Sequence, residues 1–146
     1  MPIVAALLCV LVLLGIAAAA VVVHRWHFGT PAVYGAAAAV NAVLLAIGLV
    51  FLLGGLDPSA TILPLGLPWL GAHFRLDALS AVFLVVVNLG SAAASLYGIG
   101  YGRHEAEPGR VLPFYAAFLA GMNMVVLAAD AFAFLLSWEF MSLASW

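Results

Sequence analysis

The sequence has 146 residues, of which 68% are hydrophobic and only 7% are charged. A soluble domain carries about 25% charged residues, so the composition excludes a protein with an ordinary water-facing surface. The formal net charge is −2, lysine is absent and the arginines are scattered, so nothing indicates a nucleic-acid partner. These features predict an all-α protein that crosses a membrane several times.

Four long stretches without any charged residue define the first apolar segments of the chain. Each is close to or above the ~18 to 20 residues that a helix needs to cross a bilayer. We expect one membrane domain over residues 1–146, with helices at 3–23, 32–53, 79–101, 112–129 and 131–146. The last helix would be about 24 Å long, and a helix that stopped inside lipid would leave carbonyl groups unsatisfied. The sequence therefore predicts the N-terminal part of a longer protein.

Residues 54–77 differ in character from the apolar runs on either side. Gly54 and Gly55 should end the second helix, and three prolines forbid another long helix before residue 77. The segment from His73 to Leu76 alternates between polar and apolar residues, as a half-buried strand does. We expect a short β-hairpin lying over the membrane surface, with an irregular loop as an equal alternative.

The arginines predict the orientation of the chain in the membrane. The connections after the first and third expected helices contain Arg25, Arg103 and Arg110, whereas the connection after the second contains only Arg75. Because cytoplasmic loops carry an excess of basic residues, we expect the N-terminus and the 54–77 segment outside the cytoplasm.

Polar residues inside the third expected helix form a stripe. Asn88, Ser91 and Ser95 share one helix face, which usually means hydrogen bonds to a neighbouring helix; a hydrated path is the alternative. His24 and His27 are spaced for a metal ion, but their place at a membrane boundary favours an anchoring role. The sequence predicts no metal site and no cofactor.

Glu139 is the most informative residue of the sequence. It is the ninth residue of the fifth expected helix, about 12 Å from the helix start and so near the middle of the membrane. A carboxylate there is costly, so it normally faces a protein interior or a water-filled cavity. Burial favours its neutral form and a nearby cation its charged form, so a site between these influences can load and release a proton. The alternative is a permanently neutral side chain that only binds another helix.

Three further residues are expected to support this site. Ser142 lies one turn beyond Glu139 and shares its helix face. Asp130 is the polar break between the fourth and fifth expected helices, and Asp77 precedes the third. Both aspartates are good helix N-caps beside the positive end of the helix dipole.

Four segments of the second half of the chain are familiar as a set: FRLDALS at 74–80, YGIGY at 97–101, MVVLAAD at 124–130 and WEFMSLAS at 138–145. The chain from residue 74 onward resembles the antiporter-like proton-pumping subunits shared by respiratory complex I, multi-subunit sodium/proton antiporters and membrane-bound hydrogenases. The last segment is the most specific, and it is most similar to hydrogenase-4 component B and formate hydrogenlyase subunit 3. Family members commonly have glycine where Ala78 stands.

The resemblance implies a function for the parent protein. Glu139 matches the glutamate of the family's proton path, whose lysine partner lies on a later helix. We expect a proton-translocating subunit, without catalytic residues or a redox centre of its own, in a hydrogenase-4- or complex I-like assembly of the plasma (inner) membrane. Its partners would be other membrane subunits, the lipid bilayer and protons, with sodium ions as an alternative, and this piece alone should be inactive. A cation/proton antiporter subunit and a small structural or assembly protein remain alternatives.

Overall fold

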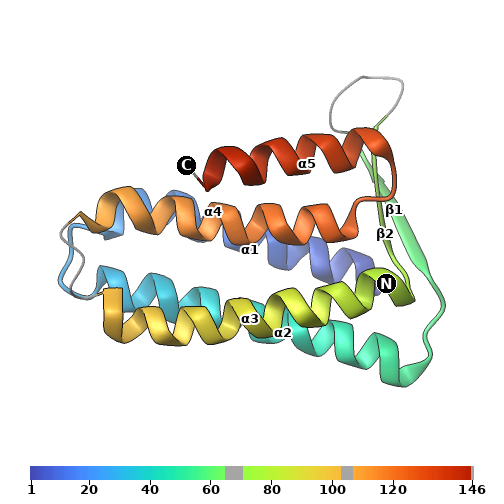
Figure 1. The fold of residues 1–146 in the computed structure, drawn as a ribbon, viewed down its shortest axis with the longest axis horizontal. Coiled ribbons are helices and arrows are strands. Elements are labelled where there is room, and N and C mark those ends of the chain that lie inside the picture. Colours follow the sequence, from blue (N-terminus) through green and yellow to red (C-terminus); the bar gives the residue numbers. More distant parts are fainter. Residues whose placement is uncertain (65–70, 103–106, 146) are drawn as a thin grey trace.

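A computed structural model describes residues 1–64, 71–102 and 107–145 and shows an all-α membrane bundle with one small β-sheet. All the helices run roughly along the long axis of the molecule (Figure 1). The expected fold class is confirmed, including the hairpin between the second and third helices. The elements in chain order are α1 (Pro2–Val23), α2 (Gly29–Gly54), β1 (Ser59–Leu63), β2 (Ala72–Leu76), α3 (Ala78–Tyr101), α4 (Pro108–Leu127) and α5 (Ala131–Ala144).

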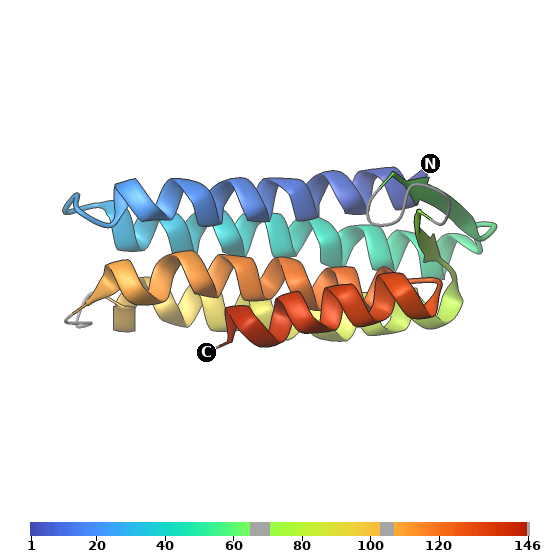
Figure 2. The same ribbon diagram turned by 90° about the horizontal axis from the view of Figure 1, so that it is seen from above.

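The four long helices form the body of the bundle, and α5 lies outside it. α1 packs against α2 and α4, α2 and α4 also pack against α3, and α5 packs against α4 on its outer side (Figure 2). α4 begins at Pro108 rather than at residue 112, because a proline in the first turn loses no helical hydrogen bond. α5 ends at Ala144, and residue 146, included in the expected fifth helix, lies outside the described residues.

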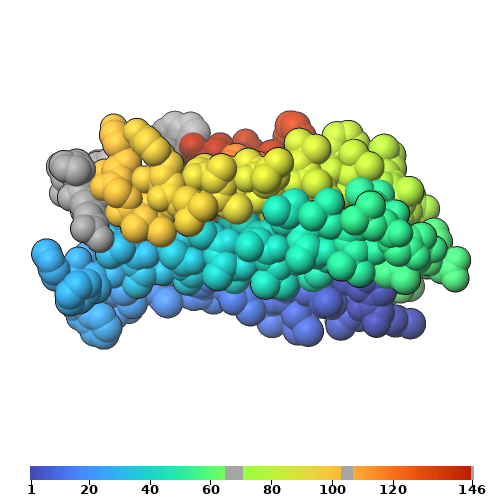
Figure 3. Space-filling model, turned by 90° about the horizontal axis from the view of Figure 1, so that it is seen from below, coloured from blue at the N-terminus to red at the C-terminus, as the bar shows by residue number. Residues whose placement is uncertain are grey.

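The outward faces of the long helices are apolar. Val12, Val43 and Val86 are among the exposed hydrophobic residues, and Figure 3 shows α1, α2 and α3 side by side along one face. The buried face of α1, by contrast, includes small residues such as Ala6 and Ala20. Small residues let helices approach closely where lipid is already as apolar as a protein core. All four long helices have the length and hydropathy to cross a membrane, as in a multi-pass membrane protein.

The segment between α2 and α3 forms the antiparallel hairpin rather than the alternative loop. α2 ends at Gly54, and Gly55 follows with φ 57°, a left-handed conformation that favours glycine. β1 then pairs with β2, with Ser59 opposite Leu76. The apolar run expected at residues 65–70 lies outside the described residues.

The hairpin covers one end of the bundle. Along β2, Ala72, Phe74 and Leu76 are buried while Arg75 is exposed, as the alternating sequence predicted. The backbone N–H of Ile3 donates to Ser59 Oγ at 3.4 Å, which ties the start of α1 to β1. The other edge of β2 continues into the turn between α4 and α5. This turn and the start of α1 therefore lie at the hairpin end.

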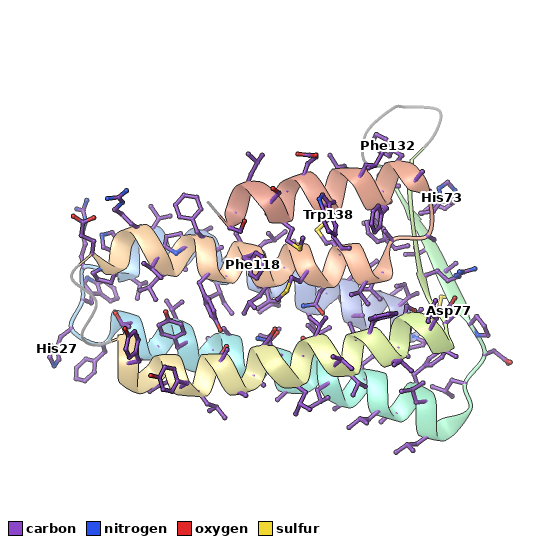
Figure 4. The ribbon with its side chains drawn as sticks, viewed as in Figure 1. His27, His73, Asp77, Phe118, Phe132 and Trp138 are labelled. Atoms are coloured by element: carbon purple, nitrogen blue, oxygen red, sulfur yellow. The ribbon has the colours of Figure 1, made fainter. Side chains whose placement is uncertain are left out.

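The connection between α1 and α2 lies at the opposite end. Figure 4 shows His27 there, whereas His73 and Asp77 lie at the hairpin end. The two ends correspond to the two groups of loops compared by their arginines. Which end faces the cytoplasm stays a prediction.

Candidate functional site

α5 is positioned by a cap at its start and a close helix contact near its end. Asp130 Oδ1 accepts a hydrogen bond from the backbone N–H of Ala133 at 2.7 Å, so the expected N-cap is present. Further along, Gly121 of α4 lies directly against Met141 of α5. A Cβ atom added to Gly121 would lie 2.8 Å from Met141 Cα. The glycine therefore allows the two backbones to approach closely, which fixes the register of α5 on α4.

Glu139 lies on the part of α5 that faces away from α4. It is exposed, as are Leu135 and Leu143, which lie one helical turn before and after it. Among the described residues, Glu139 has no hydrogen-bond or ion-pair partner. The described part of the chain therefore holds Glu139 in place but leaves its carboxylate uncovered.

The register of α5 gives the depth of Glu139 in the bundle. α4 and α5 are antiparallel neighbours (Figure 1), and Gly121 faces Met141. A position two residues before Met141 is thus level with one two residues after Gly121, which places Glu139 at the depth of Asn123. Asn123 is fully buried and its Oδ1 accepts a hydrogen bond from Asn88 Nδ2 at 2.7 Å. Polar groups from α3, α4 and α5 consequently share one depth inside the apolar part of the chain.

Ser142 shares the exposed side of α5 with Glu139, but the two side chains form no hydrogen bond with each other. The backbone carbonyl of Ser142 accepts a hydrogen bond from Ser145 Oγ at 2.7 Å, near the end of the helix. The structure thus brings Ser142 to the expected side without linking it to the carboxylate. A supporting role for Ser142 stays a prediction.

Asp130 lies at the hairpin end, nine residues before Glu139, and joins α5 to β2. Besides the cap, its Oδ2 accepts hydrogen bonds from the backbone N–H and ring Nδ1 of His73, at 2.8 and 2.9 Å. The backbone N–H of Ala129 donates in return to the carbonyl of His73 at 2.8 Å. The Ala133 N–H, followed by the contacts from His73, lowers the pKa of Asp130 against a smaller opposing effect of desolvation.

Asp77 begins α3 at the same end of the bundle. Its Oδ1 accepts from the backbone N–H of Ser80 at 2.9 Å, and Ser80 Oγ accepts from the backbone N–H of Asp77 at 2.8 Å. Arg75 forms an ion pair with Asp77 at 2.9 Å. The Ser80 N–H is the largest influence that lowers the pKa of Asp77. Both aspartates therefore stabilise helix starts and lie away from Glu139.

Sequence reasoning missed most of the partners. It used His73 only as part of an alternating strand, and it did not single out Asn41 of α2 or Asn123 of α4, which are both fully buried. Of the polar stripe on α3, Asn88 bonds Asn123 and Ser95 bonds the hydroxyl of Tyr115 at 2.7 Å. The available signal was an asparagine within an apolar run, since a buried amide in a membrane needs a partner.

Within the described ranges, no three His, Cys, Asp or Glu side chains are grouped in a way that could hold a metal ion. His24 Nδ1 lies 3.2 Å from the carbonyl of Ala20 in its own helix. The chemistry open to the described site is therefore proton exchange at a carboxylate.

Similarity to known proteins covers about half of the chain. No protein-family model matches it. Over 80 residues, 54% of the chain, it is 39% identical to an uncharacterised protein of Mycobacterium tuberculosis (strain H37Rv), with a match of the same extent in strain CDC 1551. Over 74 residues, 49% of the chain, it is 35% identical to hydrogenase-4 component B of Escherichia coli (strain K12). The matched regions span only 12% and 11% of these relatives.

Proposed function

We propose that residues 1–146 form a membrane domain of a proton-translocating subunit, and that Glu139 carries the proton. The observation on which this rests is a carboxylate halfway along an apolar helix bundle, held in register by Gly121 and uncovered on its outer side. The similarity to hydrogenase-4 component B supports a hydrogenase-4- or complex I-like assembly in the plasma (inner) membrane. Other membrane subunits, lipid and protons are then the partners.

The cost of a membrane carboxylate explains why a covering partner is needed. Facing lipid, Glu139 would stay neutral and could not exchange protons, because its charged form is too costly there. The described basic side chains cannot assist it, since Arg25 and Arg110 lie at one end of the bundle and Arg75 at the other. A protein segment or a water-filled space must therefore cover the outer side of α5. A cation in that cover would favour the charged form and allow titration.

The experiment replaces Glu139 in the complete assembly and measures proton uptake into inverted membrane vesicles driven by the electron donor. Glu139→Gln keeps the size and hydrogen bonding but removes the titration, so assembly should be normal and proton uptake lost. Glu139→Asp keeps the charge but withdraws it by one methylene, so uptake should be partial. Glu107→Gln is the matched control, because Glu107 lies outside the membrane in an exposed pair with Arg110.

The outcomes separate the competing functions. Full proton uptake by an assembled Glu139→Gln variant would contradict the proposal and leave Glu139 as a helix-binding residue. Repeating the assay with and without sodium ions tests the transported ion. Uptake that occurs only with a sodium gradient, without an electron donor, would favour the cation/proton antiporter.

A further inference from the structure

Two buried amide oxygens between α2 and α3 lack a hydrogen-bond donor. Asn41 and Asn88 have 0% exposed surface, and the Oδ1 atom of each has no partner among the described residues. Each Nδ2 donates to the carbonyl one turn earlier, Asn41 to Ala37 and Asn88 to Leu84, both at 2.8 Å. Unpaired polar atoms are costly inside a protein, and buried ones nearly always have a partner.

Rotating the amides does not remove this deficit. If the amide of Asn41 were turned over, its Nδ2 would replace Oδ1 and its bond to Ala37 would be lost, so an unpaired donor would replace an unpaired acceptor. Asn88 is held more firmly, because its Nδ2 also donates to Asn123 Oδ1. Ser137 Oγ also lacks a partner, but a serine hydroxyl can rotate to bond a carbonyl of its own helix. Only the asparagines need an outside donor.

The register of α2 on α3 places the two oxygens near each other. A Cβ on Gly48 would meet Ala81 and Val85, and Cβ atoms on Gly98 and Gly102 would meet the ring of Tyr34. Asn41 is seven residues from both Gly48 and Tyr34 and so lies on the same helix face. Its level on α3 is midway between these contacts, at Ser91. Asn88 is one turn from Ser91, an axial offset of about 5 Å.

A water molecule fits this pair of acceptors. Water has two O–H groups and can donate one to each oxygen, and two such hydrogen bonds of ~2.8 Å bridge acceptors about 5 Å apart. Ser91 is buried at the same level and offers a hydroxyl for a third bond. A sodium ion would need a compensating negative charge. The described acidic side chains, among them Asp77 and Asp130, lie at the bundle ends or, for Glu139, on the outer side of α5.

We propose that Asn41 and Asn88 bind one water molecule between α2 and α3, each accepting one of its hydrogens. The site goes beyond the proposed function, because it involves neither Glu139 nor proton movement. The bound water satisfies both acceptors at the depth where the helices are most apolar. It thereby links α2 to the hydrogen bond between α3 and α4.

The test is a set of leucine variants of the full chain in mild detergent, with the equilibrium between folded and unfolded forms measured. If the water is present, Asn41→Leu removes one of its acceptors and leaves Asn88 unpaired, so the unfolded fraction should rise roughly tenfold. In the Asn88→Leu background, where the water site is already broken, Asn41→Leu should have little further effect. In the Asn123→Leu background, which keeps Asn88 Oδ1, it should retain its full effect.

Two results would overturn the proposal. Without a bound water, Asn41→Leu removes a costly unpaired atom, so it should be neutral or stabilising, and equally so in all three backgrounds. A structure at a resolution that shows ordered water provides a test independent of folding. Density within hydrogen-bond distance of both Oδ1 atoms supports the site; a direct contact between the two asparagines, or an empty apolar gap, rejects it.

Discussion

Replacing Gly121 by alanine tests the register that places Glu139. The added Cβ would lie 2.8 Å from both Cα and Cβ of Met141, whereas carbon atoms in contact are normally about 3.5–4.0 Å apart. The shortfall of roughly 0.7–1.2 Å involves a backbone atom, so it cannot be relieved by a side-chain rotation. α5 would have to move away from α4.

The magnitude follows from two opposing contributions. Forcing an extra carbon into a packed contact costs about 1–3 kcal/mol, while alanine is favoured over glycine in a helix by about 0.8–1.0 kcal/mol. Gly121→Ala should therefore destabilise the chain by roughly 0–2 kcal/mol. Gly90→Ala in α3 is the matched control, because its Cβ would meet no atom within 4 Å. Only the favourable contribution applies there, so the two variants should differ by about 1–3 kcal/mol.

The assay is unfolding of the purified chain in mixed detergent micelles, followed by far-ultraviolet circular dichroism. Gly90→Ala should unfold at higher denaturing-detergent content than the parent chain, and Gly121→Ala at the same or lower content. Equal stabilisation by both substitutions would show that α4 and α5 are not in close contact at Gly121. The depth assigned to Glu139 would then lose its basis.

Three further predictions concern the hairpin end and the orientation. Asp130→Asn should keep the helix cap and protect the hairpin from proteolysis better than Asp130→Ala, because asparagine also caps; equal cleavage of both would contradict the capping role. The lowered pKa of Asp130 means that its stabilising contribution is present above the ordinary aspartate pKa of about 3.9 and is lost as pH falls through the lower folded value, so cleavage near β2 by an acid-active protease should rise only below about pH 4, and less in Asp130→Asn. In a Cys9→Ser background, an impermeant thiol reagent should label Ala60→Cys but not Glu107→Cys in intact cells, and the reverse pattern would invert the predicted orientation.

The helices and their starts were predictable because lipid leaves the backbone few choices. An apolar run in a membrane must satisfy its own N–H and C=O groups, so it forms a helix. The caps at Asp77 and Asp130 and the end of α2 at Gly55 depend on neighbouring residues alone. The alternation from His73 to Leu76 was sufficient for β2 for the same reason.

The contacts between distant segments were not predictable. His73 meets Asp130 across 57 residues, and Asn88 meets Asn123 across 35. In a soluble bundle the apolar stripe shows which helix faces meet, but in this chain both the lipid side and the interior are apolar. Glu139 could thus be placed in depth from its position in the helix, whereas the side of α5 on which it lies required the contact between Gly121 and Met141.

The bond between β2 and the α4–α5 turn has a consequence for the synthesis of the protein. His73 leaves the ribosome 57 residues before Asp130, a delay of about 3–11 s at 5–20 residues per second. During that interval the edge of β2 that later pairs with Ala128 has no partner, and an unpaired strand edge is open to wrong pairing. We expect the nascent chain to be most vulnerable to aggregation and proteolysis in these seconds, and the arrival of the α4–α5 turn to end that period.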